Sequence, residues 1–309
     1  MILVVAASPG RLLEPLVEDY RRTRAVTVIS PRYARGAPLS PLAAVDAGLR
    51  LLARDRTDRR YLADFAIRDL IDRWAAREVR RRMPDTVVAC SLAARRTFAA
   101  AKTIGARTVL VLDLPLFRTL HRDLDRAAAR WPDRAFLRRF RAPSWALAQQ
   151  EAERVLADLV LVRGSYARSI CLADGIAAPR IAALPAPPRP AVTAPTQPTN
   201  RVRLAGLAAA RHGVDTALAA ARLLGKTLVV RIGDGTEPAD LVRRRDVAID
   251  DGPVDAIICP AVCETYAPEL RVTGIPVIAS PMASLDGTGP DPYDIAAFAA
   301  ALRWPPTCT

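Results

Sequence analysis

The chain has 309 residues, of which 51% are hydrophobic, and it carries a formal net charge of +13. This composition excludes a disordered chain and suits two domains with hydrophobic cores. No apolar run reaches the roughly 18 residues that a membrane span needs, and the N-terminus, MILVVAASPG, lacks the basic start of a signal peptide. We therefore expect a cytoplasmic protein. It could bind at a membrane surface or on DNA through its positive charge.

The positive charge is unevenly divided along the sequence. Residues 1–199 hold 34 Lys and Arg against 19 Asp and Glu, a net +15, whereas residues 200–309 hold 11 against 13, a net −2. Only Lys102 and Lys226 are lysines, a bias that suggests a GC-rich genome but does not explain the asymmetry. The excess predicts a polyanionic partner for the first half, either nucleic acid or an anionic membrane surface.

The first half alternates between apolar runs and helical periodicity. The start, MILVVAASPGRLLEPLVEDYRR, predicts a strand, a tight turn and a helix. Further strands are predicted at 25–30, 86–90 and 107–113, helices at about 41–55 and 61–83, a basic helical region at 117–145, and helix, strand, turn and helix over 146–176. This alternation is typical of a parallel sheet covered on both faces.

A proline-rich segment separates the two halves. Residues 184–199, LPAPPRPAVTAPTQPT, contain six prolines and no regular pattern, which indicates a linker. Alternation then resumes, with strands predicted at 202–208, 226–235, 246–250 and 254–260, and helices at 213–224, near 237–245 and at 291–304. We expect domains at 1–185 and 201–309 joined by a hinge at 186–200, with a ligand site in the cleft between them.

Several segments occur in a recognisable order. AERVLADLVLVRGSYARSICLADGIAAPRIAALPAP is followed by LAGLAAARHGVDTAL, VVRIGDG, VDAIICPA and finally CETYAPELRVTGIPVIAS. This order resembles family-4 glycosyltransferases of the GT-B fold, in which two Rossmann-like domains face each other across a cleft. The last segment corresponds to the family's Glu-x7-Glu motif, although here four residues separate Glu264 from Glu269, and the C-terminal domain is shorter than usual.

The resemblance implies a nucleotide diphosphate sugar, linked to UDP or GDP, as co-substrate, with no separate cofactor and no metal. Glu269 would hold the donor ribose and Glu264 the transferred sugar. Pro268 and Gly274 independently predict a short helix at 268–273 whose N-terminus presents amides to a diphosphate. The full set of donor-binding residues implied is Gly10, Gly206, Arg211, His212, Gly233, Asp234, Thr265, Tyr266 and Glu269.

The phosphate-binding cations of that family have no direct equivalent in this chain. They fall on Leu207 and His212, so Arg211 or Arg231 would have to supply the charge. The five cysteines are scattered, and the closest pair, Cys259 and Cys263, has no histidine cluster to complete a zinc site.

Catalytic groups are expected where predicted strands end. Asp113, at the end of VLVLD, is a candidate acceptor base or sugar ligand, and His121 on the following basic helix is the one histidine of this half. Together with Glu264 they form the predicted catalytic set. The basic segment 117–145, with Trp131 and Trp145, could contact phosphates or lie at a lipid interface, or could be a solvated helix pair.

These observations predict a glycosyltransferase, retaining and metal-independent by resemblance. Its acceptor would be polyanionic: a hydroxymethylated base of DNA, flipped out of the duplex, or an anionic lipid head group. Three alternatives remain open at this point: a small-molecule or polysaccharide acceptor, a non-catalytic GT-B-fold binding protein, and an epimerase of the same fold.

Overall fold

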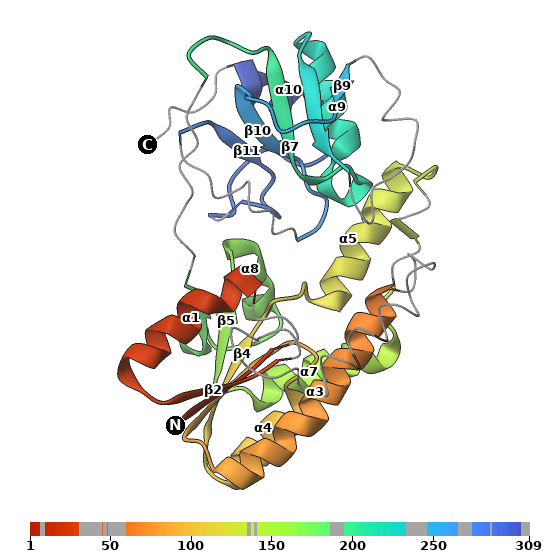
Figure 1. The fold of residues 1–309 in the computed structure, drawn as a ribbon. Coiled ribbons are helices and arrows are strands. Elements are labelled where there is room, and N and C mark those ends of the chain that lie inside the picture. Colours follow the sequence, from red (N-terminus) through yellow and green to blue (C-terminus); the bar gives the residue numbers. More distant parts are fainter. Residues whose placement is uncertain are drawn as a thin grey trace. The chain divides into compact units, whose positions relative to one another are not determined.

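The computed structural model describes residues 1–6, 10–30, 45, 48, 60–134, 137–138, 141–185, 195–232, 246–264, 274–284 and 286–303. The chain divides into two units (Figure 1). Unit 1 comprises 1–118, 142–163 and 170–187, and unit 2 comprises 119–141, 164–169 and 188–309. Two of the passages between the units lie within helices, α5 (Phe117–Arg130) and α8 (Ser165–Ala173). Part of the first half of the sequence therefore belongs to unit 2.

Unit 1 is built on a parallel sheet of the order β2-β1-β3-β4-β5-β6. The strands are β1 (Ile2–Val5), β2 (Val26–Ile29), β3 (Thr86–Cys90), β4 (Arg107–Val111), β5 (Leu159–Val162) and β6 (Ile181–Ala183). The central strands are short apolar runs buried along most of their length, as a sheet covered on both faces requires.

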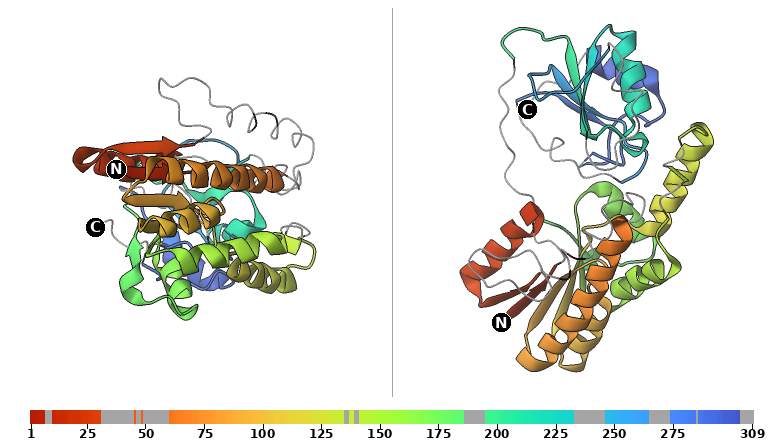
Figure 2. Two further views of the ribbon diagram at one scale, coloured as in Figure 1. Left: turned by 90° about the horizontal axis from the view of Figure 1, so that it is seen from below. Right: turned by 45° about the vertical axis from the view of Figure 1, so that its right-hand side comes forward.

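Helices α1 (Gly10–Thr23), α3 (Arg60–Arg82), α4 (Arg95–Thr103) and α7 (Ser144–Leu156) accompany this sheet. Helix α4 packs against both α3 and α7, and α3 and α4 run side by side in both views (Figures 1 and 2). On α3, hydrophobic residues every three or four positions are buried, among them Phe65, Ile71 and Val79, which gives the helix one buried face.

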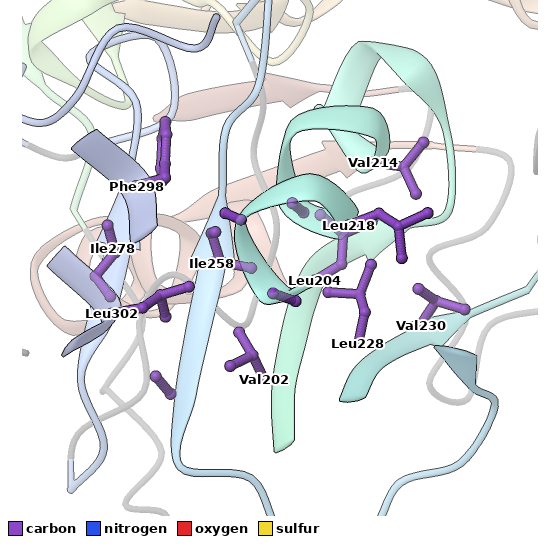
Figure 3. Close-up of a cluster of buried hydrophobic side chains, with 14 of the residues drawn as sticks. Val202, Leu204, Val214, Leu218, Leu228, Val230, Ile258, Ile278, Phe298 and Leu302 are labelled. Carbon is purple, nitrogen blue, oxygen red and sulfur yellow. The ribbon is translucent and has the colours of Figure 1, made fainter. Parts of the chain in front are cut away.

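Unit 2 is built on a second parallel sheet of the order β11-β10-β7-β8-β9. Its strands are β7 (Arg201–Leu207), β8 (Thr227–Arg231), β9 (Val247–Ala248), β10 (Ala256–Cys259) and β11 (Val277–Ala279). Helices α9 (Val214–Leu223) and α10 (Ile295–Arg303) pack against each other and cover one face. Figure 3 shows that face, where Val202, Leu204 and Leu228 of the sheet meet Leu218 and Phe298 of the helices.

The strand orders locate a switch point in each sheet. In unit 2 the chain builds outward from β7 through β8 to β9 and then returns to β10 on the other side of β7. This is the order of the first five strands of a Rossmann sheet, in which ligands bind outside the carboxyl ends of the two strands where the direction reverses. The switch point of unit 2 thus lies between β7 and β10, and that of unit 1 between β1 and β3.

The predicted fold class is confirmed, with two α/β units of parallel strands. Helix α4 and strands β6 and β11 were not predicted. The basic region 117–145 is interrupted, since α5 ends at Arg130 just before Trp131 and Pro132. The predicted helices at 237–245 and 268–273, most of 41–55 and residues 186–194 of the predicted hinge lie outside the described residues. None of the described helices is long and apolar enough to cross a membrane.

Candidate functional site

The loop that follows β7 is organised around a buried histidine. The ring nitrogen Nδ1 of His212 lies 3.1 Å from the backbone nitrogen of Leu207 and 2.8 Å from its carbonyl oxygen, so the ring can accept from the one or donate to the other. Gly206, at φ +81°, passes so close that a Cβ there would lie 2.9 Å from Nδ1. The end of β7 therefore requires glycine at position 206, for both its conformation and its packing against the His212 ring.

Burial, together with repulsion from Arg211, lowers the pKa of His212 to about 4 despite the backbone hydrogen bond to Leu207. The imidazole is consequently neutral at neutral pH. At the position where the sequence resemblance implies a phosphate-binding cation, the chain holds an uncharged ring that supports the loop. Arg211 beside it is exposed and is the charged group of this turn.

The loop after β7 is joined to the loop after β10 by close backbone contacts. Val262 N–H donates to the carbonyl of Arg211 at 3.1 Å. Gly213, at φ +76°, lies so near that a Cβ there would be 1.9 Å from the carbonyl oxygen of Pro260. Helix α9 begins immediately afterwards, so the two contacts set the amino end of α9 against the carboxyl end of β10.

The amino end of α9 combines several features that suit an anion. The amides of its first turn have no partners within the helix, and the aligned peptide dipoles give this end a partial positive charge. Asp215 in the first turn is paired with an arginine from the basic segment: Arg134 Nε donates to Asp215 Oδ2 at 3.2 Å, and Arg134 Nη2 donates to Oδ1. The ion pair offsets the negative charge of Asp215 next to this helix end.

Glu264 lies in the loop after β10, on the other side of the same switch point. Its residue is half-buried and its Oε1 atom is shielded from solvent. The loop is fastened by Ser280 of the segment after β11, whose hydroxyl donates to the carbonyl of Ala261 at 2.7 Å. Four predicted site residues are therefore brought to one edge of the unit 2 sheet: Gly206, Arg211, His212 and Glu264.

Other predicted donor-binding residues lie outside the described residues: Gly233, Asp234, Thr265, Tyr266 and Glu269. Their roles stay predictions. Gly10 is described and begins α1, next to the switch point of unit 1. Among the described residues there is no group of three or more His, Cys, Asp and Glu side chains that could hold a metal ion.

In unit 1, Asp113 is held in a buried ion pair. Its carboxylate accepts from Arg68 Nη2 at 2.7 Å and from the backbone N–H of Ser91 at 3.1 Å, and Arg68 also donates to the Ser91 carbonyl at 2.7 Å. Only 12% of the Asp113 side chain is exposed. The arrangement links the carboxyl ends of β3 and β4. The role of Asp113 as acceptor base stays a prediction, and an acceptor hydroxyl would have to compete with Arg68 and Ser91 for its carboxylate.

His121 lies on α5 in the part of that helix that belongs to unit 2. Partial burial and the nearby positive charge of Arg141 lower its pKa, and Asp125 opposes the shift. Its imidazole is therefore neutral at neutral pH and has the protonation state of a base. Its catalytic role stays a prediction.

A buried glutamate that was not predicted lies at the switch point of unit 1. Glu153 on α7 accepts from the backbone N–H groups of Leu92 at 2.8 Å and Ala94 at 3.0 Å, in the loop after β3. Burial raises its pKa to about 8, although these two hydrogen bonds and one from Gln149 oppose the shift. Leu92 has φ +63°, so Glu153 holds a strained loop conformation in place.

Many arginines of the basic segment have carboxylate partners. Arg118 of α5 pairs with Glu151 of α7, and Arg141 pairs with Asp125 of α5, so these ion pairs join segments that are separate in sequence. Arg126 and Arg130 of α5 are exposed. The ring of Trp131 packs against the ring of Tyr293, and the two ring centroids lie 5.3 Å apart.

No protein-family model and no curated protein matches the chain. Solved structures match over 98% of its length. The apo form of the lipopolysaccharide outer core galactosyltransferase WaaB is 14% identical, with 89% of its chain covered and a TM-score of 0.52. The UDP-GlcNAc 2-epimerase from Neisseria meningitidis bound to UDP-GlcNAc is 8% identical, with 91% covered and a TM-score of 0.49. S. aureus MnaA with UDP is 10% identical, with 87% covered and a TM-score of 0.47.

The similarity to the galactosyltransferase concerns the fold. It agrees with the two parallel sheets and with the Rossmann strand order of unit 2, and the chain accordingly has the GT-B fold of two Rossmann-like units. The function has to be argued from the site itself.

Proposed function

We propose that the chain is a glycosyltransferase that moves a sugar from a nucleotide diphosphate sugar to a hydroxyl group. The observation that carries the proposal is the switch point of unit 2, where the glycine-bounded loop after β7, the amino end of α9 and Glu264 meet at one sheet edge. A Rossmann sheet uses this edge for nucleotides.

Each part of this edge has a chemical counterpart in the donor. The diphosphate would lie at the first-turn amides of α9, with the exposed Arg211 as a cation beside it. Glu264 would accept hydrogen bonds from hydroxyl groups of the transferred sugar. Retention of configuration and independence from a metal ion belong to the proposal through the sequence resemblance.

We propose a polyanionic acceptor because of the positive charge. Candidates are the hydroxyl of a hydroxymethylated base in DNA and the head group of an anionic lipid. Steep salt dependence of duplex binding would favour DNA, and binding to anionic vesicles without duplex affinity would favour lipid. If neither binds, the acceptor is a small molecule or polysaccharide.

The proposal is tested by a melting-temperature screen of nucleotide sugars followed by a transfer assay. A nucleotide sugar that binds the folded chain raises its melting temperature. The selected donor is then incubated with hydroxymethylated DNA, plain DNA and anionic vesicles, and each product is weighed by mass spectrometry. We expect the mass of one acceptor to rise by one glycosyl residue. Release of the nucleoside diphosphate in the absence of any acceptor would favour an epimerase. Binding of the donor without turnover would contradict transfer to DNA or lipid, and would leave a small-molecule or polysaccharide acceptor or a non-catalytic protein.

A further inference from the structure

One side of helix α3 in unit 1 exposes large apolar side chains. Leu62 is 39% exposed, Leu70 37% and Trp74 39%, whereas the buried apolar residues of the helix lie on its opposite side. Leu70 and Trp74 are four positions apart and are therefore neighbours on the helix surface. These three side chains lie outside the core of unit 1, so they are available to a partner.

Exposed arginines share this side of α3. A helix turns by about 100° per residue, which places four exposed arginines in the same third of the helix surface as the three apolar residues. With a rise of about 1.5 Å per residue, the strip is about 28 Å long. We call it the α3 outer face, and it consists of Leu62, Leu70, Arg73, Trp74, Arg77, Arg80 and Arg81.

The arginines of the α3 outer face reach further into solvent than the carboxylates beside them. Arg73 pairs with Asp69, and Arg81 pairs with Glu78. In each pair more than half of the arginine side chain is exposed, whereas the carboxylate is mostly covered. The other two arginines form no ion pair with any residue that the structure describes. Because exposed ion pairs are weak, all four guanidinium groups can contact an external anion.

The mixture of apolar and cationic side chains distinguishes between partners. A second copy of the α3 outer face would bring arginines against arginines, which repel each other. The phosphates of a nucleic acid would pair with the arginines but would leave Leu62 and Leu70 without apolar contacts. An anionic bilayer satisfies both kinds of side chain, because arginines can reach the lipid phosphates while leucines enter the boundary with the acyl chains.

We propose that the α3 outer face docks the chain on an anionic lipid surface. The helix lies along the membrane plane, with Leu70 and Trp74 in the interface and the arginines at the level of the phosphates. Trp74 suits this depth because its ring is apolar at one end and carries an N–H donor at the other. The inference goes beyond the proposed function, since docking does not depend on which acceptor is glycosylated.

The test measures binding of the full chain to vesicles made of equal parts phosphatidylglycerol and phosphatidylcholine. Flotation gives the partition constant at physiological ionic strength, and vesicles of phosphatidylcholine alone give the neutral reference. Arg77→Glu combined with Arg80→Glu should weaken binding about 25-fold or more, since each arginine near an anionic surface contributes about fivefold. Leu70→Ser combined with Trp74→Ser should weaken it about tenfold through lost apolar burial.

Two control variants make the same chemical changes elsewhere. Arg22→Glu combined with Arg24→Glu reverses two exposed arginines at the end of α1, and Leu223→Ser removes an exposed leucine at the end of α9. Both controls should retain the partition constant of the wild type within about twofold, because charges away from the contact are screened by salt.

The inference is overturned if the wild type binds anionic vesicles no better than neutral ones, or if the α3 variants bind them as the wild type does. It is also overturned if these variants lose affinity for duplex DNA while the wild type ignores vesicles, since the face would then serve nucleic acid. Melting-temperature shifts with nucleotide sugars keep the two proposals apart. Shifts without docking leave the proposed function standing, and docking without any shift leaves only the lipid surface.

Discussion

Glu153 shows how much a single residue can couple stability to pH. In the folded chain its pKa is raised from 4.5 to about 8, so the folded state holds a proton that the unfolded state releases. Its contribution to stability is fully present below about pH 4.5 and is lost as the pH rises toward 8. A shift of this size corresponds to about 3–5 kcal/mol.

We expect Glu153→Gln to remove this dependence. The free energy of unfolding of the wild type should fall relative to that of the variant between pH 4.5 and 8, because only the wild type loses the bound proton. Urea denaturation at several pH values measures the difference. Two parallel curves across this range would show that Glu153 does not titrate there.

His212 predicts the opposite trend. Its pKa is lowered from 6.5 to about 4 in the folded chain, so its contribution to stability is present above pH 6.5 and is lost as the pH falls toward 4. At most about 3 kcal/mol is involved. His212→Asn places an amide near the position of Nδ1 and does not titrate. The wild type should therefore lose stability relative to this variant between pH 6.5 and 4, and a constant difference would contradict the neutral, buried ring.

The sequence alone did not show that Glu153 and His212 are buried, or which groups they contact. His212 stands where the resemblance implies a phosphate-binding cation. This indicated a changed site, but not a buried ring that supports its own loop. Glu153 resembles an ordinary surface glutamate on a helix. The one available signal is that Gln149, Gln150 and Glu153 share a helix face, and all three are buried. Its backbone partners at Leu92 and Ala94 are some 60 positions earlier, beyond any local pattern.

At the scale of elements, the placement of α9 depends on Gly213. Both its left-handed conformation and its contact with Pro260 exclude a side chain. Gly225, just after the other end of α9, has φ +63°, but a Cβ added there would have nothing within 4 Å. Substituting Gly225 therefore tests the left-handed conformation alone, whereas substituting Gly213 tests this conformation together with the contact with Pro260.

We expect Gly213→Ala to destabilise the chain by about 4 kcal/mol, because the new methyl would displace α9 from the β10 loop, and Gly225→Ala by about 1 kcal/mol. Denaturant unfolding gives both values. Where the Gly213 variant folds, its affinity for a nucleoside diphosphate should fall, whereas that of the Gly225 variant should not. Equal costs for both substitutions would contradict the contact between the loops after β7 and β10.

The basic segment 117–145 shows what local sequence patterns do not reveal about a helix, namely its distant partners and where it ends. Its helical periodicity was clear, but the pairing of Arg134 with Asp215 joins positions 81 apart. Trp131 and Pro132 are a local signal for the end of α5, yet the regular spacing of arginines continues past them and favoured a longer helical region. Strands followed their apolar runs closely, because a strand buried on both faces needs a continuous apolar sequence.

At the scale of the whole molecule, the two structural units divide the net charge more evenly than the two halves of the sequence do. The sequence halves differ by +15 against −2, but unit 1 has 25 Lys and Arg against 16 Asp and Glu, a net +9, and unit 2 has 20 against 16, a net +4. The difference arises because the arginines of 119–141 belong to unit 2. Both units therefore carry a net positive charge, which favours the approach of anionic ligands to either unit.

The alternation of strands and helices was sufficient to predict the α/β class and two parallel sheets. The strand order was not predictable from local patterns, since it depends on which strands pair across long connections. That order is what identifies the switch point between β7 and β10, and with it the meeting of Gly206, Arg211 and Glu264 at one edge.

The central claim is that this edge of unit 2 binds a nucleoside diphosphate. The most direct measurement is calorimetric titration of the full chain with UDP and GDP, each compared with its nucleoside. We predict saturable binding of at least one diphosphate, with a dissociation constant on the order of micromolar to millimolar, and much weaker binding of the matching nucleoside, because the α9 amides and Arg211 act on the phosphates. Equal affinity for a diphosphate and its nucleoside, or no binding of either diphosphate, would contradict the account.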